Sequence, residues 1–600
     1  MTAKLQSIIL PKIDICPIEE LFLRLNSKSS FNYEANQAEL KKGGIITFNT
    51  YFNSFSSDKW KSNTNVKNIS INLIFKGAFI IKILNIDYFS ESPILVNQRI
   101  IAADNLDKVS VFENIDLQQY KGLLYLEIES LEDDCLFKGG DFYTNVNAGE
   151  QKNINFALII CTYKRESYVY KNVQLIEKYL NHEADLAANL DIFIIDNGKT
   201  LNKFDNTNIH LIANKNAGGS GGFTRGIIEV MKAEKKISHV IFMDDDVLID
   251  PEVIERIYRF LSLTNNKDLC LGSSMLRLDK KYIQHEKGAI WSNAFFPIKS
   301  NLDLRESNNV LFNEYEEHID YSAWWFFCFP TKILDENKLP YPFFIRMDDV
   351  EFSIRLKQKI LILNGICVWH EPFENKHSPS LLYYDRRNGL IFNALYFDKF
   401  GRLNAVKWFL KPVLRHLACY RYATAAHILK GIADFIKGPD YISSIDPEEK
   451  HKEVLRVEEK AVKNPEAPFI YSKYIESVSQ TESRIHRFFR IITLNGHILP
   501  SMFLHPEEKL TDKGYKVVPS YDSKALNAFR AKTILYYNLE TQEGFVVQFS
   551  RLKFFKILTK TMLLAITLYF QFPKLKKLYR ETLPELTNRS FWEKYLEISN

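Results

Sequence analysis

His239-Val240-Ile241-Phe242-Met243, followed at once by Asp244-Asp245-Asp246, is the stretch that decides the fold. Its apolar run is typical of a strand that is buried on both faces of a sheet. Three adjacent carboxylates repel one another unless a cation or solvent compensates their charge. Because alternate residues of an extended segment point the same way, we expect Asp244 and Asp246 on one side and Asp245 on the other. Oxygen ligands of this kind suit Mg²⁺ or Mn²⁺, and an acidic loop capping the next helix is the alternative.

Further buried strands and helices alternate around this stretch. The predicted strands cover residues 156–160, 191–195 and 210–212. A helix is predicted over 168–179, and residues 218–232 are predicted to form a glycine-rich turn that opens into a helix. Strands that alternate with helices predict a parallel, doubly wound sheet, here an α/β domain over residues 151–380. In such sheets ligands bind at the carboxyl ends of the strands.

The flanking segments differ in character, and 600 residues suggest about three domains. Residues 1–150 hold short alternating strands at 69–75, 77–83 and 122–128, which predict a β-sandwich. This sandwich could bind carbohydrate or serve as a scaffold. Residues 381–600 are predicted to be mainly helical, with one helix at 389–400 and another at 405–436 that Pro412 kinks.

The composition excludes several classes of protein. A net charge of +5 gives no global field for nucleic acid. The seven cysteines are scattered and contain no CxxC pair, so neither a zinc knuckle nor a disulfide framework is indicated, which suits a reducing cytoplasm. The first residues contain no basic region leading into a long apolar run, so we expect no secretory signal.

One segment near the C-terminus points to a membrane surface. The uncharged stretch between Lys560 and Lys574 has 13 residues, fewer than the ~20 that a membrane-spanning helix needs. Its flanking lysines favour a basic amphipathic helix lying on an anionic membrane. A buried core helix with a solvated basic face is the alternative.

Polar residues that could hold a ligand follow three predicted strands. The loop Cys161-Thr162-Tyr163-Lys164-Arg165 could stack on a nucleotide base and hold a diphosphate through Arg165, and Asp196 could accept hydrogen bonds from uracil or ribose. Asn216 opens a glycine-rich run to Gly222 that allows close approach of a ligand to the backbone. This run lacks the Walker-A lysine and the dinucleotide-binding spacing, which argues against an NTPase and an NAD enzyme.

Together these motifs resemble a known family. The succession Thr162-Tyr163-Lys164-Arg165, Asp196-Asn197, Asn216-Ala217-Gly218-Gly219 and Asp244-Asp245-Asp246 is similar to that of family 2 glycosyltransferases with the GT-A fold. More narrowly, the chain resembles the polymerising galactofuranosyltransferases of bacterial cell-wall galactan. Those enzymes have an N-terminal β-sandwich, a GT-A domain and a helical C-terminal region, which is the order expected here. The specific motifs all lie between about 160 and 370.

The resemblance implies an acceptor site and a catalytic base. The paired tryptophans Trp324-Trp325 would line the acceptor site; if they lie in a strand, only one of them can face the sugar. An inverting transfer needs a base for the acceptor hydroxyl, and by position Asp349 is that base, with Asp348 binding the acceptor. A charge pair that complements a helix dipole is the alternative for these two residues. His285 lies in a region that contacts the acceptor in the family, although the match is loose there.

The resemblance also implies the metal and nucleotide ligands. His370 would complete the shell of a Mn²⁺ or Mg²⁺ ion with Asp244 and Asp246, and Asp245 would then contact the donor sugar or ribose. The nucleotide-sugar contacts fall to Thr162, Arg165, Asp196 and Asn216, together with Asp244 and Asp245. The segment 385–388 would help to hold the leaving diphosphate.

The expected function is therefore inverting, metal-dependent transfer of a sugar from a UDP-sugar to a surface polysaccharide or lipid-linked glycan. Galactofuranose is the best guess for the sugar, while UDP-galactose, UDP-glucose and dTDP-rhamnose are alternative donors. The expected place is the inner face of a bacterial plasma membrane, and homo-oligomerisation stays open. A non-catalytic carbohydrate-binding protein is disfavoured by the joint presence of the acidic motifs and the histidine. A nucleotidyltransferase is disfavoured because its glycine-rich loop would follow the first strand, not the third.

Overall fold

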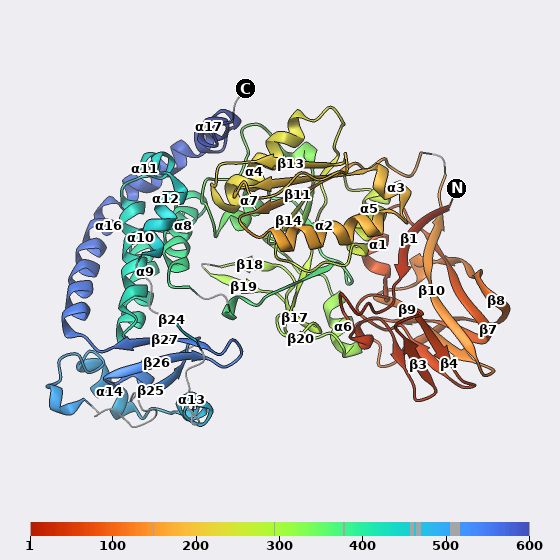
Figure 1. The fold of residues 1–600 in the computed structure, drawn as a ribbon, viewed down its shortest axis with the longest axis horizontal. Helices are drawn as coiled ribbons and strands as arrows, with labels where there is room; N and C mark the ends of the chain where they lie inside the picture. Colours follow the sequence, from red (N-terminus) through yellow and green to blue (C-terminus); the bar gives the residue numbers. More distant parts are fainter. Residues whose placement is uncertain are drawn as a thin grey trace. The chain divides into compact units, whose positions relative to one another are not determined.

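The chain divides into two compact units of mixed α/β structure. The computed structural model describes residues 2–147, 149–292, 294–375, 378–456, 461–463, 470–504, 516–521 and 523–598. The first unit comprises residues 1–215, 222–339 and 352–372, and the second comprises 216–221, 340–351 and 373–600. Figure 1 shows the elements of both units along the chain. The α/β class agrees with the prediction.

The N-terminal strands of the first unit are hydrogen-bonded into one ten-stranded sheet. Its central order is β2-β5-β9-β7-β10-β4-β3, and all its pairs are antiparallel. The strands are β1 (Thr2–Ile8), β2 (Arg24–Leu25), β3 (Ser29–Asn32), β4 (Gln37–Leu40), β5 (Ile45–Thr47), β6 (Phe55–Ser56), β7 (Asn68–Ile86), β8 (Ile94–Asp116), β9 (Leu123–Ser130) and β10 (Cys135–Asn145). Two facing sheets are the mark of a sandwich. Because hydrogen bonding joins these strands into one sheet, the sandwich stays a prediction.

Strand β7 unites two segments that were predicted as separate strands. Its pairing with β8 shifts register between Phe75 and Gly77, and Gly77 has φ +102°. A Cβ at this position would lie 2.4 Å from the Sγ of Cys135, so only glycine fits the bulge. The glycine therefore bends one long strand instead of ending it.

A seven-stranded sheet with the order β13-β12-β11-β14-β21-β15-β22 forms the centre of the first unit. Its strands are β11 (Phe156–Thr162), β12 (Leu190–Asp196), β13 (Ile209–Ala213), β14 (His239–Asp244), β15 (Cys270–Gly272), β21 (Phe326–Pro330) and β22 (Ile360–Leu361). Strands β11 to β14 are parallel to one another, as predicted. Strand β21 is antiparallel to β14 and β15, so the prediction of an all-parallel sheet is wrong beyond β14. Many doubly wound sheets carry such a reversed strand.

The other elements of the first unit include two smaller sheets. One has the order β20-β17-β16-β23 and the other pairs β18 with β19. These strands are β16 (Ser274–Arg277), β17 (Ile283–Glu286), β18 (Ala289–Trp291), β19 (Phe295–Pro297), β20 (Leu302–Asp303) and β23 (Cys367–His370). The helices are α1 (Ser57–Asn63), α2 (Glu166–Leu180), α3 (Ala184–Ala188), α5 (Glu252–Leu263) and α6 (Ser307–Glu314), with the short helices η1 (Glu19–Leu21), η2 (Leu117–Gln119) and η3 (Thr331–Ile333). A turn at Asn364-Gly365 separates β22 from β23.

The N-terminal strands pack directly against helix α5. Lys4 forms an ion pair with Glu255 at 2.9 Å, and Lys12 forms one at 2.8 Å with Asp250, just before α5. The rings of Trp60 and Phe260 meet edge to face with centroids 4.7 Å apart. One compact unit therefore contains both the N-terminal sheet and the seven-stranded sheet, and the division into domains at 1–150, 151–380 and 381–600 stays a prediction.

Two helices have residues in both units: α4 (Gly218–Lys232) and α7 (Asp348–Leu356). The other helices of the second unit are α8 (Leu381–Tyr396), α9 (Arg402–Ala418), α10 (Tyr422–Ile436), α11 (Pro439–Ser444), α12 (Pro447–Leu455), α13 (Ile470–Ser479), α14 (Arg484–Ile492), α15 (Ala525–Ala528), α16 (Arg551–Leu586) and α17 (Arg589–Tyr595), with η4 (Phe373–Asn375) and η5 (Ser501–Phe503). A four-stranded sheet, β24-β27-β26-β25, joins β24 (Ala461–Lys463), β25 (Lys516–Pro519), β26 (Thr533–Asn538) and β27 (Glu543–Gln548).

The helix predicted for 405–436 is two helices, and its break is not at the proline. Pro412 lies inside α9, and the chain turns at Cys419–Arg421, where Tyr420 has φ +58°. A left-handed residue ends a helix because it directs the next peptide out of the helical path. Pro412 lies within α9, so the kink predicted there stays a prediction.

Helix α16 contains the segment 560–574. The sequence left two alternatives for this segment, a helix on a membrane surface and a helix buried in the core. One of its faces is buried, through Phe554, Thr561, Leu568, Phe572, Leu575 and Tyr579. Its other face exposes Met562, Leu563, Ile566 and Phe570, of which Phe570 is 70% exposed. The helix thus packs along one side and presents apolar side chains on the other. Among the residues that the structure describes, no helix is both long and apolar enough to cross a membrane.

Candidate functional site

The register of the central sheet brings three polar strand ends together. In the parallel pairing, Thr162 at the end of β11 lies opposite Asp196 at the end of β12. On the other side of β11, Cys161 lies opposite Asp244, the last residue of β14. The polar side chains therefore gather at the carboxyl edge of β11, β12 and β14, where such sheets bind ligands.

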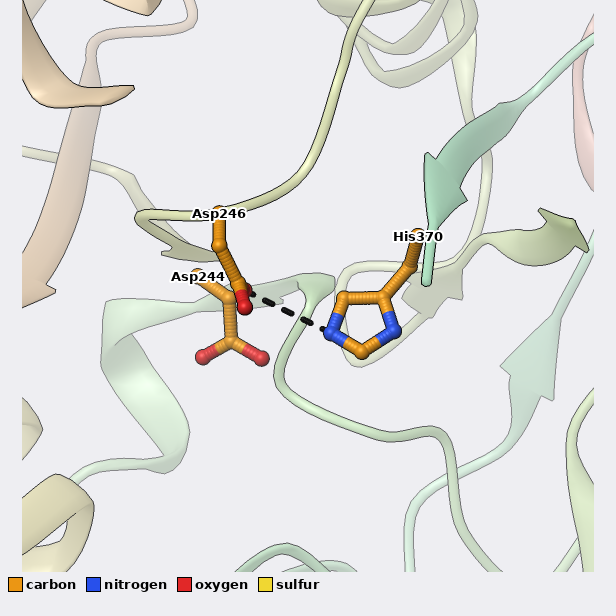
Figure 2. Close-up of side chains that lie close together, drawn as sticks. All are labelled: Asp244, Asp246 and His370. Carbon is orange, nitrogen blue, oxygen red and sulfur yellow. Dashed lines mark ion pairs between the residues drawn. The ribbon is translucent and has the colours of Figure 1, made fainter. Parts of the chain in front are cut away.

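Asp244, Asp246 and His370 form a cluster at this edge. Each can offer one ligand atom, and these atoms lie within 4.8 Å of one another. Figure 2 shows the His370 ring directed toward the two carboxylates, with its Nε2 3.4 Å from Asp246 Oδ1. The strand of His370 is held there by two backbone hydrogen bonds between Leu248 and Trp369, of 2.8 and 2.9 Å. Asp246 and His370, which are 124 residues apart in the sequence, thus lie next to each other.

The donor set of this cluster fits a divalent cation. Two carboxylates supply hard oxygen ligands, and the imidazole adds a nitrogen of intermediate softness. Mg²⁺ is usually held by oxygen alone, whereas Mn²⁺ accepts the mixed set more readily. Asp244, Asp246 and His370 could therefore hold a divalent cation, and their role as its ligands stays a prediction.

The middle aspartate points to the other side. Asp245 accepts hydrogen bonds from Thr162 Oγ1 at 2.7 Å and from Arg165 Nη1 at 3.0 Å. Arg165 also forms an ion pair with Asp246 at 2.7 Å. Burial raises the pKa of the Asp245 carboxyl, and the charge of Arg165 opposes this effect. Arg165 therefore neutralises two of the three adjacent carboxylates in the structure.

Asp196 orders the loop that follows its strand. Its two carboxylate oxygens accept four backbone N–H groups, from Gly198, Lys199, Thr200 and Leu201, at 2.7 to 2.9 Å. Four donors fill the acceptor positions of a carboxylate. The side chain thus shapes the loop 198–201 at the edge of the sheet.

The two tryptophans of the predicted acceptor site have different neighbours. They lie in the turn before β21, not in the strand, and both are 4% exposed. The Trp324 ring packs on Phe242, with centroids 4.9 Å apart, and joins the apolar core. The Trp325 ring lies toward His370, with centroids 6.3 Å apart. Of the two, Trp325 is the one beside the metal cluster.

His285 lies in the sheet that carries His370. It belongs to β17, is partly buried, and β16 lies between its strand and β23. The structure therefore places it two strands from His370, in the first unit.

The acidic pair lies in the second unit, at the start of α7. Asp348 accepts a hydrogen bond from Ser220 Oγ at 3.1 Å, and Asp349 accepts one from the Val350 N–H at 2.8 Å. Burial raises the pKa of Asp348 to about 6. Burial and then the charge of Asp348 raise the pKa of Asp349 to about 7. A carboxyl in this range can take up and release a proton near neutral pH.

A strained loop presents the acidic pair. Phe344, Arg346 and Met347 all have left-handed φ values, of +78°, +69° and +73°. Non-glycine residues rarely adopt this region, and each costs about 1–3 kcal/mol. Gly218 accommodates the loop, because a Cβ there would lie 2.1 Å from the carbonyl oxygen of Phe344. The glycine run, predicted to admit a ligand, here admits the backbone of this loop, and Asn216 Oδ1 accepts a hydrogen bond from the Gly218 N–H at 3.1 Å.

Two buried polar side chains of α8 fix this loop. Asn388 Nδ2 donates to the carbonyl oxygens of Ile345 and Arg346, both at 2.9 Å. Arg387 donates to the carbonyl oxygen of Phe343 at 2.9 Å. The segment 385–388 was predicted to hold a diphosphate; in the structure Arg387 and Asn388 hold the backbone that precedes Asp348. Asn388 is fully buried, but because the charged residues Asp385, Arg386 and Arg387 precede it, no signal in the sequence marks it as buried.

Part of the chain, which includes Thr162, Asp196, Asp244 and Trp325, matches a known family. Residues 157–331 match the family described as Glycosyl transferase family 2. The chain is 24% identical over 599 residues to the protein named Galactofuranosyltransferase GlfT2 of Mycobacterium tuberculosis (strain ATCC 25618 / H37Rv), covering 91% of this chain and 90% of that protein. It is 23% identical over 607 residues to the protein of the same name from Mycolicibacterium smegmatis (strain ATCC 700084 / mc(2)155), covering 95% and 92%.

Proposed function

We propose that this chain, a glycosyltransferase of family 2 with the GT-A fold, transfers galactofuranose from UDP-galactofuranose to a glycan, with inversion at the anomeric carbon. The observation that carries the choice of sugar is the similarity to two galactofuranosyltransferases over more than nine tenths of the chain. UDP-galactose, UDP-glucose and dTDP-rhamnose are the rival donors.

The first unit supplies the ligands for a cation in this proposal. Asp244, Asp246 and His370 would hold Mn²⁺ or Mg²⁺, which when bound neutralises charge on the leaving UDP. Arg165 pairs with Asp245 and Asp246 in the structure, so it has to exchange at least one of them for the diphosphate. This exchange keeps the charge of the guanidinium compensated before and after the donor binds.

The remaining donor contacts follow from the strand ends. Thr162 and Asp245, which are hydrogen-bonded to each other, would meet the ribose or the sugar. Asp196 would act through the loop 198–201 that it orders, beside the nucleotide base. Asn216 would contribute from the start of α4.

The second unit supplies the base. Asp349 would take the proton of the acceptor hydroxyl as that oxygen attacks the anomeric carbon, and Asp348 would bind the acceptor. The raised pKa of Asp349 suits this task, since the carboxylate form then has a useful affinity for a proton near neutral pH. Trp325 would stack on an acceptor sugar, and His285 would contact the acceptor. The acceptor would be a surface polysaccharide or a lipid-linked glycan at the inner face of a bacterial plasma membrane, and the enzyme could act as a homo-oligomer.

The test is a panel of donors with the purified full chain. UDP-galactofuranose, UDP-galactose, UDP-glucose and dTDP-rhamnose are each incubated with Mn²⁺ and a galactan-type oligosaccharide. Nucleotide release and product mass are measured. Extension by hexose only from UDP-galactofuranose supports the proposal, and extension only from another donor contradicts the choice of sugar.

The variant Asp349→Ala tests the role of the base independently of donor binding. Asp349→Ala should abolish transfer while UDP binding stays nearly intact, because the base acts on the acceptor. Asp205→Ala is the matched control, since Asp205 is exposed and outside the site. Full transfer by Asp349→Ala would remove this residue from its role.

A further inference from the structure

The last helix of the chain, α17, places a tryptophan deep inside the second unit. Asn588 caps this helix, because its side chain accepts a hydrogen bond from the Phe591 N–H at 2.7 Å. Trp592 is 0% exposed, and Leu596, just after the helix, is 2% exposed. Figure 1 shows α17 at the C-terminal end of α16. Tryptophan is so large that it is rarely buried completely, so α17 is an integral part of the unit.

The Trp592 ring contacts the start of the loop that carries the acidic pair. Its Nε1 donates a hydrogen bond to the carbonyl oxygen of Pro340 at 2.9 Å. Pro340 is buried and begins the segment 340–347, which leads directly into Asp348 and Asp349. Strained backbone persists only where the surrounding structure holds it, and this segment contains the three left-handed residues. The hydrogen bond therefore fixes the point at which the strained loop begins.

The same ring also contacts the glycine run beside the acidic pair. A Cβ at Gly221 would lie 3.7 Å from Trp592 Cζ3 and 3.3 Å from Leu596 Cδ2. The residue before Gly221 is Ser220, which donates its Oγ to Asp348 at 3.1 Å. Helix α17 therefore packs against both the loop before the acidic pair and the turn of α4 that holds Asp348.

Tyr595 of the same helix reaches the middle of the loop. It lines a small cavity together with Pro342 and Phe344, and its ring packs edge to face on Trp592, with centroids 5.7 Å apart. Asn388 of α8 donates to the carbonyl oxygens of residues 345 and 346. Two helices, α8 and α17, thus hold the loop at different points.

We propose that Trp592 is a positioning residue for the acidic pair: it holds the start of the loop 340–347 and thereby keeps the Asp349 carboxylate in place for the acceptor hydroxyl. The inference rests on the proposed function, in which Asp349 is the base. Trp592 acts through the loop and is not itself a catalytic residue. Because a misplacement of about 1 Å can cost about a hundredfold in rate, a helix at the end of the chain can govern turnover.

The variant Trp592→Phe tests this role in the full chain. It keeps most of the ring and removes the N–H that the buried Pro340 carbonyl accepts. We expect kcat to fall about tenfold or more, while the donor KM and the UDP affinity stay within about twofold. The acid limb of the pH profile should move to lower pH, because burial is the main cause that raises the pKa of Asp349 and a loosened loop admits water.

Amide hydrogen exchange measures the loop itself, independently of the reaction. The backbone N–H groups of residues 341–350 should exchange about tenfold faster in Trp592→Phe than in the wild type, whatever sugar is transferred. This measurement separates the two proposals. Full transfer by Asp349→Ala would contradict the proposed base, whereas unchanged exchange in Trp592→Phe would contradict the role of α17 alone.

Two further variants complete the test. Trp60→Phe makes the same change at a tryptophan of the first unit that is 2% exposed, and it should keep the wild-type kcat, pH profile and loop exchange. Leu596→Ala removes the contact at Gly221 and keeps the indole N–H, so kcat should fall about threefold or more. Circular dichroism checks that each variant is folded, and Leu596→Ala decides the question if Trp592→Phe does not fold.

Two results would overturn the proposal. One is a wild-type kcat together with wild-type loop exchange in Trp592→Phe and Leu596→Ala. The other is an equal loss of kcat in Trp60→Phe, because the loss would then follow from general destabilisation of the protein.

Discussion

The like-charged pair Asp348 and Asp349 makes the pH dependence of transfer a sharp test of the proposed base. The deprotonated form of Asp349 is the active one, so the rate should fall as the pH drops through about 7. Asp348→Asn removes the neighbouring negative charge and keeps an oxygen that can accept from Ser220 Oγ. The proton affinity of Asp349 should then fall, because the like charge is the second cause that raises its pKa.

The size of the effect can be worked out. If removal of the charge lowers the proton affinity about tenfold, equivalent to about 1.4 kcal/mol, the deprotonated fraction at pH 6 rises from about 9% to about 50%. At pH 8 it is above about 90% in both proteins. The ratio of kcat/KM at pH 6 to that at pH 8 should therefore rise from about 0.1 to about 0.5. The absolute rate should fall in the variant, because Asp348 is also proposed to bind the acceptor.

The assay is the pH profile of kcat/KM, followed by product mass at saturating Mn²⁺. Asp205→Asn serves as the control and should keep the wild-type profile. A second measurement is the free energy of unfolding. Since the pKa of Asp349 is raised in the folded state, its stabilising contribution is present at low pH and is lost as the pH rises toward 7. Asp348→Asn should reduce this loss. An unchanged acid limb in Asp348→Asn would refute the role of the pair.

Three further outcomes are expected. Asp246→Asn should weaken Mn²⁺ binding at least about a hundredfold in calorimetry while Asp205→Asn leaves it unchanged, and equal affinities would exclude Asp246 as a ligand. Asn388→Leu should lower kcat about 10–100-fold with unaltered UDP affinity, because the loop before the acidic pair loses the hydrogen bonds that Asn388 donates to it. A normal kcat would show that the loop keeps its conformation without these hydrogen bonds. Trp324→Ala should lower the free energy of unfolding by about 3–5 kcal/mol in denaturant unfolding, because Trp324 packs in the core. Trp325→Phe should mainly raise the acceptor KM. The reverse result would make Trp324 the acceptor residue and Trp325 the core residue.

The central sheet could be predicted because its strands carry strong local signals. Apolar runs ending in polar residues mark β11, β12 and β14. The helix expected to follow a glycine-rich turn within 218–232 is α4, which already begins at Gly218. The four-stranded sheet of the second unit was not predicted, because its strands are only 3 to 6 residues long and β24 pairs with the distant β27, Ala461 lying opposite Phe545. The end of α9 could not be predicted either, because the left-handed residue at its end is Tyr420 and no glycine or proline marks the turn at Cys419–Arg421.

Some features of the candidate site could likewise be expected from the sequence, whereas others depend on the tertiary structure. Asp244 and Asp246 were expected on one side by the alternation of an extended segment, but β14 ends at Asp244 and residues 245–246 form a turn, so their meeting depends on that turn. The environment of the acidic pair cannot be predicted without tertiary information. Ser220, 128 residues away in the sequence, donates to Asp348, and Asn388, about 40 residues away, donates to the loop before the pair. The left-handed residues Phe344, Arg346 and Met347 are also invisible in the sequence, because no glycine marks their conformation.

The strain in that loop has a consequence for protein engineering. Glycine adopts left-handed backbone without penalty, so glycine at Arg346 or Met347 would relieve strain in the folded protein, although it also adds freedom to the unfolded chain. A selection for thermal stability alone could therefore favour relaxed loops, in which the carboxylates of α7 are held less firmly. Variants that gain heat resistance at these positions should lose turnover, so stability and catalysis would be in competition along this one loop.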